Sequence, residues 1–444
     1  MTATPVAAAT PFLDPETRAE GGGWLGAVRQ AGLDGYRRQG FPTPRHEAWK
    51  YTNLSAVGRL AVETPPAVPA LTAADLPGDR LLPLDVPRLV FVNGRFSAPL
   101  SDLDRLPAGV RAGSLRAVLL TDPGHLRPVL ERPQAQEAVA TLPLAALNTG
   151  FLSDGLVLEI DAGVSVEGPL HIIHLSVPGE SATLAHPRGL IRLGAGARAT
   201  LAVSYSGLPG APSVINAVTD VVLGEDAHLS HVRLLAEAPE GVHIGAVLAT
   251  VGARARYDAF TLTLGGRLVR NEIRVLLDGE GAQAHVNGAY AARKGQHIDN
   301  TVFVDHAVPN AKSSQLFKGV LDETGRGVFQ GKILVRRDAQ GTDGQQLHQA
   351  LLLTPGAEVD IKPELQIYAD DVACSHGATA GEMDAEALFY LQSRGIDEET
   401  ARALLVEAFL EDALTTVADE AVRDALTERV RDWQRGRAQA TWNV

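Results

Sequence analysis

Short strands separated by glycine-containing turns recur through the middle of the chain at nearly regular intervals. Four related turns read GAGARATL, GEDAHLSH, GARARYDA and GEGAQAHV, and each places a small residue shortly after a glycine. Successive spacings are 33, 30, 28, 27, 46 and 31 residues when the anchors are Val164, Ala197, Ala227, Ala255, Ala282, Val328 and Val359. A period of roughly 20 to 50 residues made of short strands indicates a solenoid, propeller blades or stacked hairpins.

The length of the repeat selects among these architectures. A propeller blade needs four strands, and about 30 residues are too few to supply them. The coils of a β-helix fit this length better, so the sequence predicts a mostly β protein with a β-helix core. The ends of such a solenoid are exposed and need caps, for which the flanking segments are available.

The character of the sequence changes on both sides of the repeat. Before it lie a helical candidate around Trp24 to Tyr36 and a hairpin signal in RLVFVNGRF, where Asn93-Gly94 separates two apolar runs. Strand-like alternation begins near residue 150, as in GLVLEIDAG. We therefore predict an N-terminal helical or mixed region, a β-helix and a C-terminal helical region over residues 1–145, 146–380 and 381–444.

Helical periodicity replaces the alternation after Met383. The segment DEETARALLVEAFL predicts a helix with Asp397 as its N-cap, and Gly395 lies just outside a preceding helix. The expected apolar stripe of this helix is Ala401, Leu404, Leu405, Ala408 and Phe409. A second helix is predicted from the stripe Val422, Ala425, Leu426, Val430 and Trp433. Both helices carry many charges on their other faces. They could cap the solenoid or dock a partner, and the sequence favours neither role over the other.

Composition and charge exclude several classes of partner. The net charge of −13 over 444 residues argues against nucleic acid and against an anionic membrane surface, because both attract clustered Lys and Arg. No signal peptide or long apolar stretch is apparent, so a cytoplasmic protein is expected. The single cysteine excludes an internal disulfide, which agrees with a reducing compartment.

Most polar motifs of the repeat region have structural explanations. No GxxxxGK[ST] phosphate loop is present, and the glycine pairs Gly265-Gly266 and Gly279-Gly281 fit the rhythm of the turns. HIIH (His171 to His174) and HLSH (His228 to His231) lie in strand-like runs, where residues three apart face opposite ways, so surface or core histidines are expected. HIDNTVFVDH (His297 to His306) could form a metal or acid/base site, but a polar face of the solenoid is favoured.

The only cysteine, Cys374, lies two residues before His376. On an extended strand both side chains project to one side, about 6.6 Å apart along the strand, so sulfur and imidazole can converge on one ion. Thiolate and neutral imidazole suit zinc or iron. The alternative is a buried cysteine that packs as a small hydrophobe, with His376 as a turn residue. Two ligands are too few for a structural zinc or an iron-sulfur cluster, so another chain would have to supply the rest.

Long segments of the chain resemble one known family. KPELQIYADDVACSHGATAGEMDAEALFYLQSRGI is similar to the C-terminal signature of the SufD branch of the SufB/SufD family, and PTPRHEAWKYTNL is similar to the N-terminal signature. SSQLFKGVLDETGRGVFQGKILV resembles the core that both branches share. SufB usually reads SHEA where this chain has CSHGAT, and it carries several cysteines. The missing Walker motif distinguishes the chain from the ATPase subunit SufC.

The resemblance implies a fold and a role. It implies a right-handed parallel β-helix between helical ends, and a non-enzymatic scaffold subunit of the SufBCD iron-sulfur assembly complex. Its partners would be a SufB-like paralogue and a SufC-like ATPase, the latter docked on the helices from about Asp384 to Ala438. A transient iron-sulfur cluster or iron would sit at the subunit interface, with His376 as the interface ligand and Cys374 beside it or as a second ligand. Flavin binding is associated with the whole complex and maps to no residue here.

The sequence also leaves two other functions and one other oligomeric state possible. A purely structural partner would hold the SufB-like and SufC-like chains in register without touching metal. A polysaccharide-active enzyme is the other rival, since β-helices often present carboxylates in an exposed groove. Unpaired strands at the end of a β-helix also make a homodimer reasonable.

Overall fold

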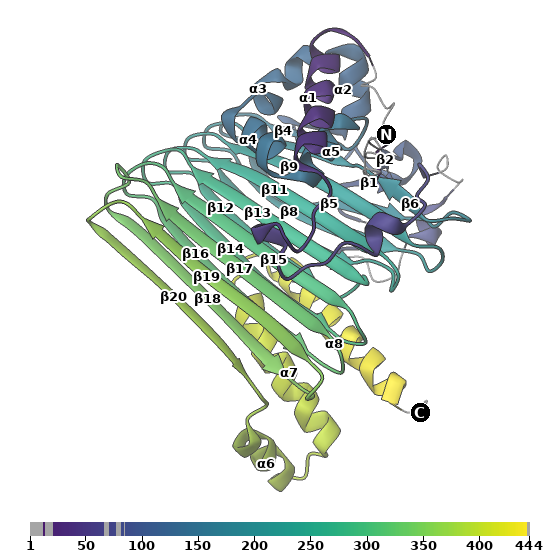
Figure 1. Cartoon of the computed structure of the whole chain (residues 1–444), viewed down its shortest axis with the longest axis vertical. Helices are drawn as coiled ribbons and strands as arrows, with labels where there is room; N and C mark the ends of the chain where they lie inside the picture. The colour runs from purple at the N-terminus through teal and green to yellow at the C-terminus, as the bar shows by residue number, and fades with distance from the viewer. Residues whose placement is uncertain (1–11, 14–20, 66–70, 77–80, 84, 442–444) are drawn as a thin grey trace, which may run out of the picture.

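The computed structural model describes residues 12–13, 21–65, 71–76, 81–83 and 85–441. Most of this chain is a parallel β-solenoid of about eight turns with helices at both ends (Figure 1). The predicted parallel β-helix core with flanking helical regions is therefore confirmed. The division into 1–145, 146–380 and 381–444 stays a prediction. The helices are α1 Gly23–Gln39, α2 Leu115–Thr121, α3 Arg127–Leu130, α4 Pro133–Thr141, α5 Pro143–Gly150, α6 Ala385–Ser393, α7 Glu398–Leu414 and α8 Glu420–Thr441.

Two sheets form the walls of the solenoid, and each coil contributes one strand to each wall. The first sheet has the order β2-β1-β5-β8-β10-β12-β14-β16-β18-β20. Its strands are β1 Arg88–Val92, β2 Arg95–Phe96, β5 Ser165–Ser176, β8 Arg198–Gly207, β10 His228–Ala236, β12 Arg256–Thr263, β14 Gln283–Ala292, β16 Lys312–Leu321, β18 Thr342–Leu352 and β20 Val372–Gly381. The β1–β2 pair is the hairpin predicted at Asn93-Gly94, which is thereby confirmed.

The second sheet has the order β19-β17-β15-β13-β11-β9-β7-β4-β3, with β6 paired to β9. Its strands are β3 Val110–Ser114, β4 Leu156–Ile160, β6 Thr183–Ala185, β7 Arg188–Leu193, β9 Ser213–Leu223, β11 Val242–Val251, β13 Leu268–Leu277, β15 His297–His306, β17 Arg326–Val335 and β19 Glu358–Ile367. Apolar side chains from both sheets meet in the lumen and form the largest core cluster.

The repeat is continuous, and the long interval expected from the sequence is wrong. By strand register, the residue equivalent to Ala282 is Ala311, followed by Thr342 and Val372, which keeps the spacing near 30 residues throughout. The anchors Val328 and Val359 lie in β17 and β19 of the second sheet. Both walls of a coil carry small apolar residues in alternation, so the pattern alone does not say to which wall a residue belongs.

Glycines in the turns allow successive coils to approach closely. A Cβ on Gly279 would lie 1.9 Å from the backbone nitrogen of Ala253, and one on Gly252 would lie 2.8 Å from the carbonyl oxygen of Leu223. Both positions therefore accept only glycine without a shift of the backbone. The interpretation of the glycine pairs as turn residues is confirmed. The close approach of successive coils requires glycine in the turns, which explains why glycine recurs at regular intervals in the sequence.

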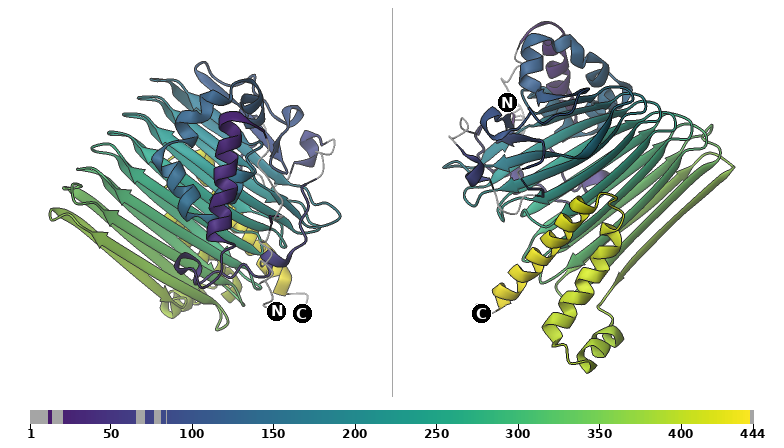
Figure 2. Two further views of the ribbon diagram at one scale, coloured as in Figure 1. Left: turned by 45° about the horizontal axis from the view of Figure 1, so that its top comes forward. Right: turned by 180° about the vertical axis from the view of Figure 1, so that it is seen from behind.

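The two helical regions cover different walls of the solenoid. In the N-terminal region α5 packs on β9 and α4 on β11, so these helices lie on the second sheet. In the C-terminal region α7 packs on β14 and β16 of the first sheet. Figure 2 shows both arrangements from two sides. None of the helices in the described parts of the chain is long and apolar enough to cross a membrane.

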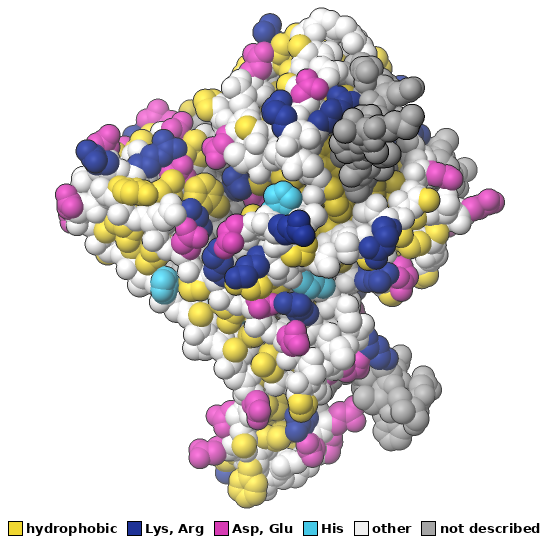
Figure 3. Space-filling view, viewed as in Figure 1, with side chains coloured by type: hydrophobic (Ala, Val, Ile, Leu, Met, Phe, Trp, Pro, Cys, Tyr) yellow, Lys and Arg dark blue, Asp and Glu magenta, His cyan; other side chains and the backbone are white. Residues whose placement is uncertain are grey.

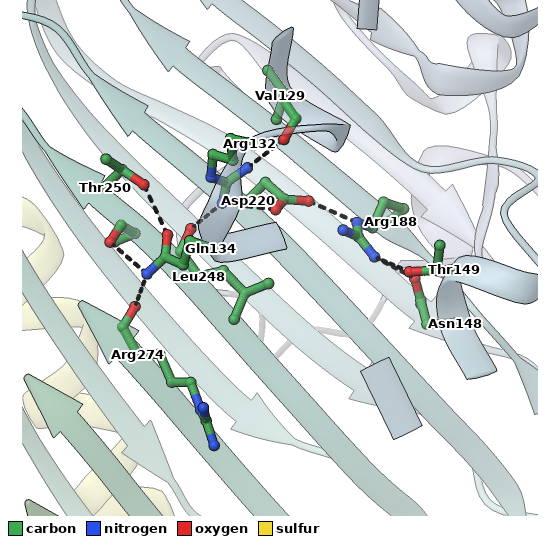
Figure 4. Close-up of polar contacts among 11 residues, drawn as sticks. Val129, Arg132, Gln134, Asn148, Thr149, Arg188, Asp220, Leu248, Thr250 and Arg274 are labelled. Atoms are coloured by element: carbon green, nitrogen blue, oxygen red, sulfur yellow. Dashed lines mark hydrogen bonds and ion pairs between the residues drawn. The ribbon is translucent and has the colours of Figure 1, made fainter. Parts of the chain in front are cut away.

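A buried charge cluster attaches the N-terminal helices to the second sheet (Figure 4). The Asp220 carboxylate of β9 accepts from Arg188 Nε at 2.7 Å and lies 2.8 Å from Nη2 of Arg132, which precedes α4. Arg188 also donates to the Asn148 and Thr149 side chains of α5. The Asp220 side chain is fully buried, so its two arginine partners are required to offset the loss of hydration.

The predicted apolar stripe of α7 is partly wrong. Leu404 is 44% exposed and Ala408 is also exposed. The side that packs on the first sheet instead carries Val406, Leu410 and Ala413. Asp397 is the N-cap, because its side chain accepts from the Thr400 N–H, as predicted. The predicted stripe of α8 is confirmed, since Val422, Leu426, Val430 and Trp433 are buried.

The partly buried His174 makes the stability of the fold depend on pH in the acid range. The His174 ring lies between Phe91 and Tyr205, with centroid distances of 5.0 and 4.4 Å. Burial, and then the nearby His243, lowers the pKa of His174 to about 3. The unfolded chain, with a histidine pKa near 6.5, therefore binds more protons than the folded chain between these values. The stabilisation is complete above about pH 6.5 and is lost as the pH falls towards 3.

Replacing His174 by Phe should reduce this acid sensitivity, because the stack is kept and the titrating group is removed. Up to about 1.4 kcal/mol per pH unit should disappear from the slope of unfolding free energy against pH. Urea midpoints measured between pH 7 and 4 check this expectation. Identical slopes for the variant and the unaltered protein would show that His174 does not control acid stability.

Candidate functional site

The strand that carries Cys374 and His376 is the last strand of the solenoid. β20 is paired only with β18, and β19 at the same end of the second sheet is paired only with β17. Most residues of β19 are only partly buried, and most of β20 are exposed. Within the described chain, no further coil or helix closes this end. Apolar side chains are exposed there as well, including Leu347 at 39%, Ile367 at 39% and Tyr368 at 64%.

Cys374 and His376 both face the lumen of this open end. Cys374 pairs in register with Gly344, where an added Cβ would lie 3.4 Å from Cys374 Sγ and 3.5 Å from the buried Ile333 side chain. His376 pairs in register with Gln346, whose side chain is buried. Residues that pair in register across parallel strands have their side chains on the same face of the sheet. Gly344 and Gln346 lie two residues apart on β18, so Cys374 and His376 share one side of β20, as expected. Cys374 is half-buried, whereas His376 is exposed.

The environment of Cys374 favours the protonated thiol. Burial raises its pKa above the ordinary value, and the Gly344 backbone hydrogen bond opposes this rise while nearby Asp343 adds to it. The Cys374 thiol must therefore lose its proton to become a thiolate ligand when an ion binds. The exposed imidazole of His376 is the more accessible donor of the two.

Gln346 is a polar group that the sequence did not single out. Its Nε2 donates to Gln315 Oε1 at 3.3 Å, whereas its Oε1 has no hydrogen-bond partner within the described residues. A Cβ on Gly331 would lie 1.3 Å from this Nε2, so the glycine leaves the space in which the amide crosses the lumen. Gln315, Gln346 and His376 follow one another in register across β16, β18 and β20. Only the strand pairing reveals this row.

The other histidine pairs do not come together as ligands. In HIIH, His171 Nε2 lies 3.1 Å from Ser204 Oγ, and His174 lies in its aromatic stack. In HLSH, His228 pairs with Asp258 at 2.7 Å, and His231 lies 2.9 Å from the Tyr257 hydroxyl. Each ring has its own partner, which confirms their interpretation as surface or core histidines.

HIDNTVFVDH contributes to structure, although the expectation of a polar face is partly wrong. Asp299 is fully buried, accepts from Thr52 and is ion-paired to Arg270, over whose guanidinium the Trp49 ring lies at 4.1 Å. This cluster attaches the segment around Trp49 to the solenoid. His306, at the other end, is buried with its Nε2 2.8 Å from Ser313 Oγ. Across the described residues, no group of three or more His, Cys, Asp and Glu side chains could hold a metal ion.

Comparison with known proteins gives matches over nearly the whole chain. Residues 18–172 match the SufBD protein N-terminal region, and residues 176–409 match the family described as SUF system FeS cluster assembly, SufBD core domain.

Curated relatives agree with these family matches. The chain is 32% identical to the iron-sulfur cluster assembly protein SufD of Escherichia coli over 404 residues, which covers 88% of this chain and 89% of the relative. It is 31% identical to an iron-sulfur cluster assembly SufBD family protein of Synechocystis over 88% of this chain and 86% of the relative. A Mycobacterium bovis member is 31% identical over 72% of this chain and 81% of its own length. The chain belongs to the SufBD family of the SUF iron-sulfur cluster assembly system.

Proposed function

We propose that this chain is a scaffold subunit, without ATPase function of its own, of an iron-sulfur assembly complex that also contains a SufB-like and a SufC-like chain. The supporting observation is the open end of the solenoid, where the only thiol of the sequence and an exposed imidazole share one face. In this role Cys374 and His376 are half of a ligand set for an iron-sulfur cargo. The partner at the same interface supplies the other ligands.

The donor chemistry of the pair supports an incomplete site. His376, as neutral imidazole, offers one nitrogen to iron, and Cys374 offers a soft thiolate sulfur once its thiol has lost its proton. A cluster usually takes four protein ligands, so two donors hold it only jointly with a neighbour. The ring nitrogen of His376 that does not bind iron carries a proton. In this proposal that N–H donates to Oε1 of Gln346 on the neighbouring strand, and this hydrogen bond would fix the orientation of the ring.

The edges of β19 and β20 are the proposed contact for the SufB-like chain. Each edge presents unpaired backbone groups next to the exposed Ile367 and Tyr368. Such edges favour pairing with strands of another chain. A second copy of this chain offers the same edges, so a homodimer is the competing occupant when the SufB-like partner is missing.

An experiment with the assembled complex separates metal binding from pure architecture. The Cys374→Ala/His376→Ala double variant is copurified with the SufB-like and SufC-like chains and assayed anaerobically for iron and sulfide. The proposal predicts an intact complex with little cluster formation. Normal cluster formation by the double variant would assign the chain to the purely structural role.

The C-terminal helices are the proposed docking surface for the SufC-like ATPase. α6 projects beyond the last coil at the lower end in Figures 1 and 3, and none of its residues is buried. Phe389 is 71% exposed and Tyr390 is 57% exposed. Large aromatic side chains on a surface are typical anchors of protein interfaces.

Phe389→Asp should weaken docking of the SufC-like chain at least about tenfold, because a charge would replace an apolar anchor. The fold should stay intact, since Phe389 packs against no core. Leu120→Asp is the matched control, because Leu120 is 74% exposed on the distant α2. Calorimetric titration with the SufC-like chain measures both variants. Equal affinities for the two variants would place the docking surface elsewhere.

A further inference from the structure

A pocket of about 320 Å³ lies at the open end of the solenoid, on the outer side of the first sheet. Its walls are the carboxyl ends of β18 and β20, the connection from β20 to α6, and Leu405 and Phe409 of α7. Cys374 and His376 lie on the same strand but face the lumen, so the pocket is separate from the proposed ligand pair. It borders the edge of β20, which pairs with no further strand of the described chain.

The interior of this pocket is largely apolar. Leu351, Met383 and Phe409 line it, and all three belong to or pack against the apolar cluster between α7 and the first sheet. Leu347, on the same outer face of β18, is 39% exposed, and its neighbour in register on β20 is Gly377, which has no side chain to cover it. Contiguous apolar surface beside an unpaired strand is typical of a protein interface.

The charges at the rim of the pocket are negative. Glu382 and Asp384 line it, and its described lining residues include no Lys, Arg or His. Asp384 is the N-cap of α6, where its side chain accepts from the backbone N–H groups of Glu386 and Ala387. Glu382 is exposed and forms no ion pair with a described residue. An occupant that carries a positive charge next to its apolar part would therefore complement the pocket.

A strand added to the first sheet at β20 would direct side chains to this pocket. Thr379 and Gly381 lie on the outer face of β20, and they pair in register with Gln349 and Leu351. Residues that pair in register share a face, so the residues opposite Thr379 and Gly381 on the added strand would also point to the outer side. A Cβ on Gly381 would meet no atom within 4 Å, so a side chain of the added strand has room there.

A second copy of this chain lacks a side chain that fits the pocket. On the outer face, its β20 presents only small residues, from Ala373 to Gly381. The outer face of its other edge strand, β19, presents Glu358, Asp360, Lys362, Glu364 and Gln366. Neither strand offers a large apolar residue on this side, so a homodimer formed through these edges would leave the pocket empty.

We propose that the pocket receives a large apolar side chain, accompanied by a Lys or Arg, from the strand of the SufB-like chain that pairs with β20. The apolar side chain fills the space beside Gly381 against Leu405 and Phe409, and the cation lies against Glu382. The pocket thereby favours the hetero-complex over the homodimer, because only the hetero-complex fills it. This inference rests on the proposed contact between β20 and the SufB-like chain.

Gly381→Leu tests the pocket, because the new side chain would occupy the space that the partner needs. It should weaken binding of the SufB-like chain at least about tenfold, chiefly through faster dissociation, as expected when a buried anchor is lost. Gly113→Leu is the matched control, since a Cβ on Gly113 also meets no atom within 4 Å and this residue lies in β3 at the other end of the solenoid. Surface plasmon resonance with the full chain measures both variants.

Glu382→Lys tests the charge at the rim. It should slow association of the SufB-like chain about tenfold at low salt, and the difference should shrink as salt is added, because rim charges act mainly on the encounter. Glu167→Lys makes the same change in net charge at an exposed residue of β5 and should have little effect. Equal effects of the two substitutions would contradict recognition of a cation at this rim.

Other results would overturn the inference as a whole. These are equal affinity of Gly381→Leu and Gly113→Leu for the SufB-like chain, and failure of the unaltered protein to bind that chain. Self-association, measured by analytical ultracentrifugation, should be the same in Gly381→Leu and in the unaltered protein. Weaker self-association of the variant would show that a second copy also fills the pocket, which would contradict the selection of the hetero-complex.

The pocket and the proposed cluster site fail independently of each other. Weak binding by Gly381→Leu, together with normal cluster formation by the Cys374→Ala/His376→Ala complex, would support the pocket and reject the ligand role. Normal binding by Gly381→Leu, together with loss of clusters in the double variant, would reject the pocket and support the ligand role.

Discussion

His376→Ala should nearly abolish cluster formation in the complex reconstituted with SufB-like and SufC-like chains, while the complex still assembles. His376 is exposed at the open end of the solenoid and belongs to none of the hydrophobic core clusters of the described chain, so the fold should not change. Loss of groups that only orient a metal ligand typically costs 10- to 100-fold in affinity, and loss of the ligand itself should cost at least about a hundredfold. Anaerobic iron and sulfide analysis of the purified complex measures the effect.

Matched variants on the same strand sharpen this prediction. Ser375→Ala changes the neighbouring exposed residue on the opposite face of β20 and should leave iron content unchanged. Cys374→Ala should give a milder loss than His376→Ala, because the half-buried thiol also packs beside Ile333. Unchanged iron content and unchanged cluster formation in His376→Ala would remove this residue from the site.

Asp220→Asn should be among the most destabilising single substitutions in the chain. The variant leaves Arg188 and Arg132 buried without a compensating charge, which typically costs 3 to 5 kcal/mol. Because Asp220 joins the second sheet to α4 and α5, hydrogen exchange in these helices should accelerate together with the fall in the thermal midpoint.

An exposed ion pair provides the control for Asp220. Asp226→Asn removes the carboxylate that pairs with Arg254 in a surface turn, where both side chains are more than half exposed. Solvent screens such pairs, so the thermal midpoint should stay nearly unchanged. A small effect of Asp220→Asn, similar to that of Asp226→Asn, would show that the buried cluster does not hold the N-terminal helices.

The repeat could be predicted from the sequence because its cause is local. Turn glycines such as Gly279 have no room for a Cβ, and strand alternation has a period of two, so both features are visible along the chain. The use of Val328 as the repeat anchor that follows Ala282 was wrong, because both walls use the same residue types and Val328 lies in the other wall. The predicted stripe of α7 was only partly wrong, since Ala401 is buried as expected. Leu404 has the correct spacing for burial, but the contact with the first sheet is made through Val406 and Leu410.

The site was predictable only as a pair of residues. The two-residue spacing of Cys374 and His376 implied a common face, but nothing in the spacing says that this face is the lumen or that no further coil follows within the described chain. The position of the unpartnered amide oxygen of Gln346 beside His376 depends on strand register between residues 30 positions apart, which sequence reasoning does not supply.

The central claim is that this chain supplies an incomplete ligand set and holds a cluster only together with a neighbour. Anaerobic reconstitution with iron and sulfide, followed by metal analysis and Mössbauer spectroscopy, should be carried out on the isolated monomer and on the complex with the SufB-like and SufC-like chains. We predict a stable cluster in the complex and none in the monomer. A monomer that retains a complete cluster after gel filtration would contradict the account.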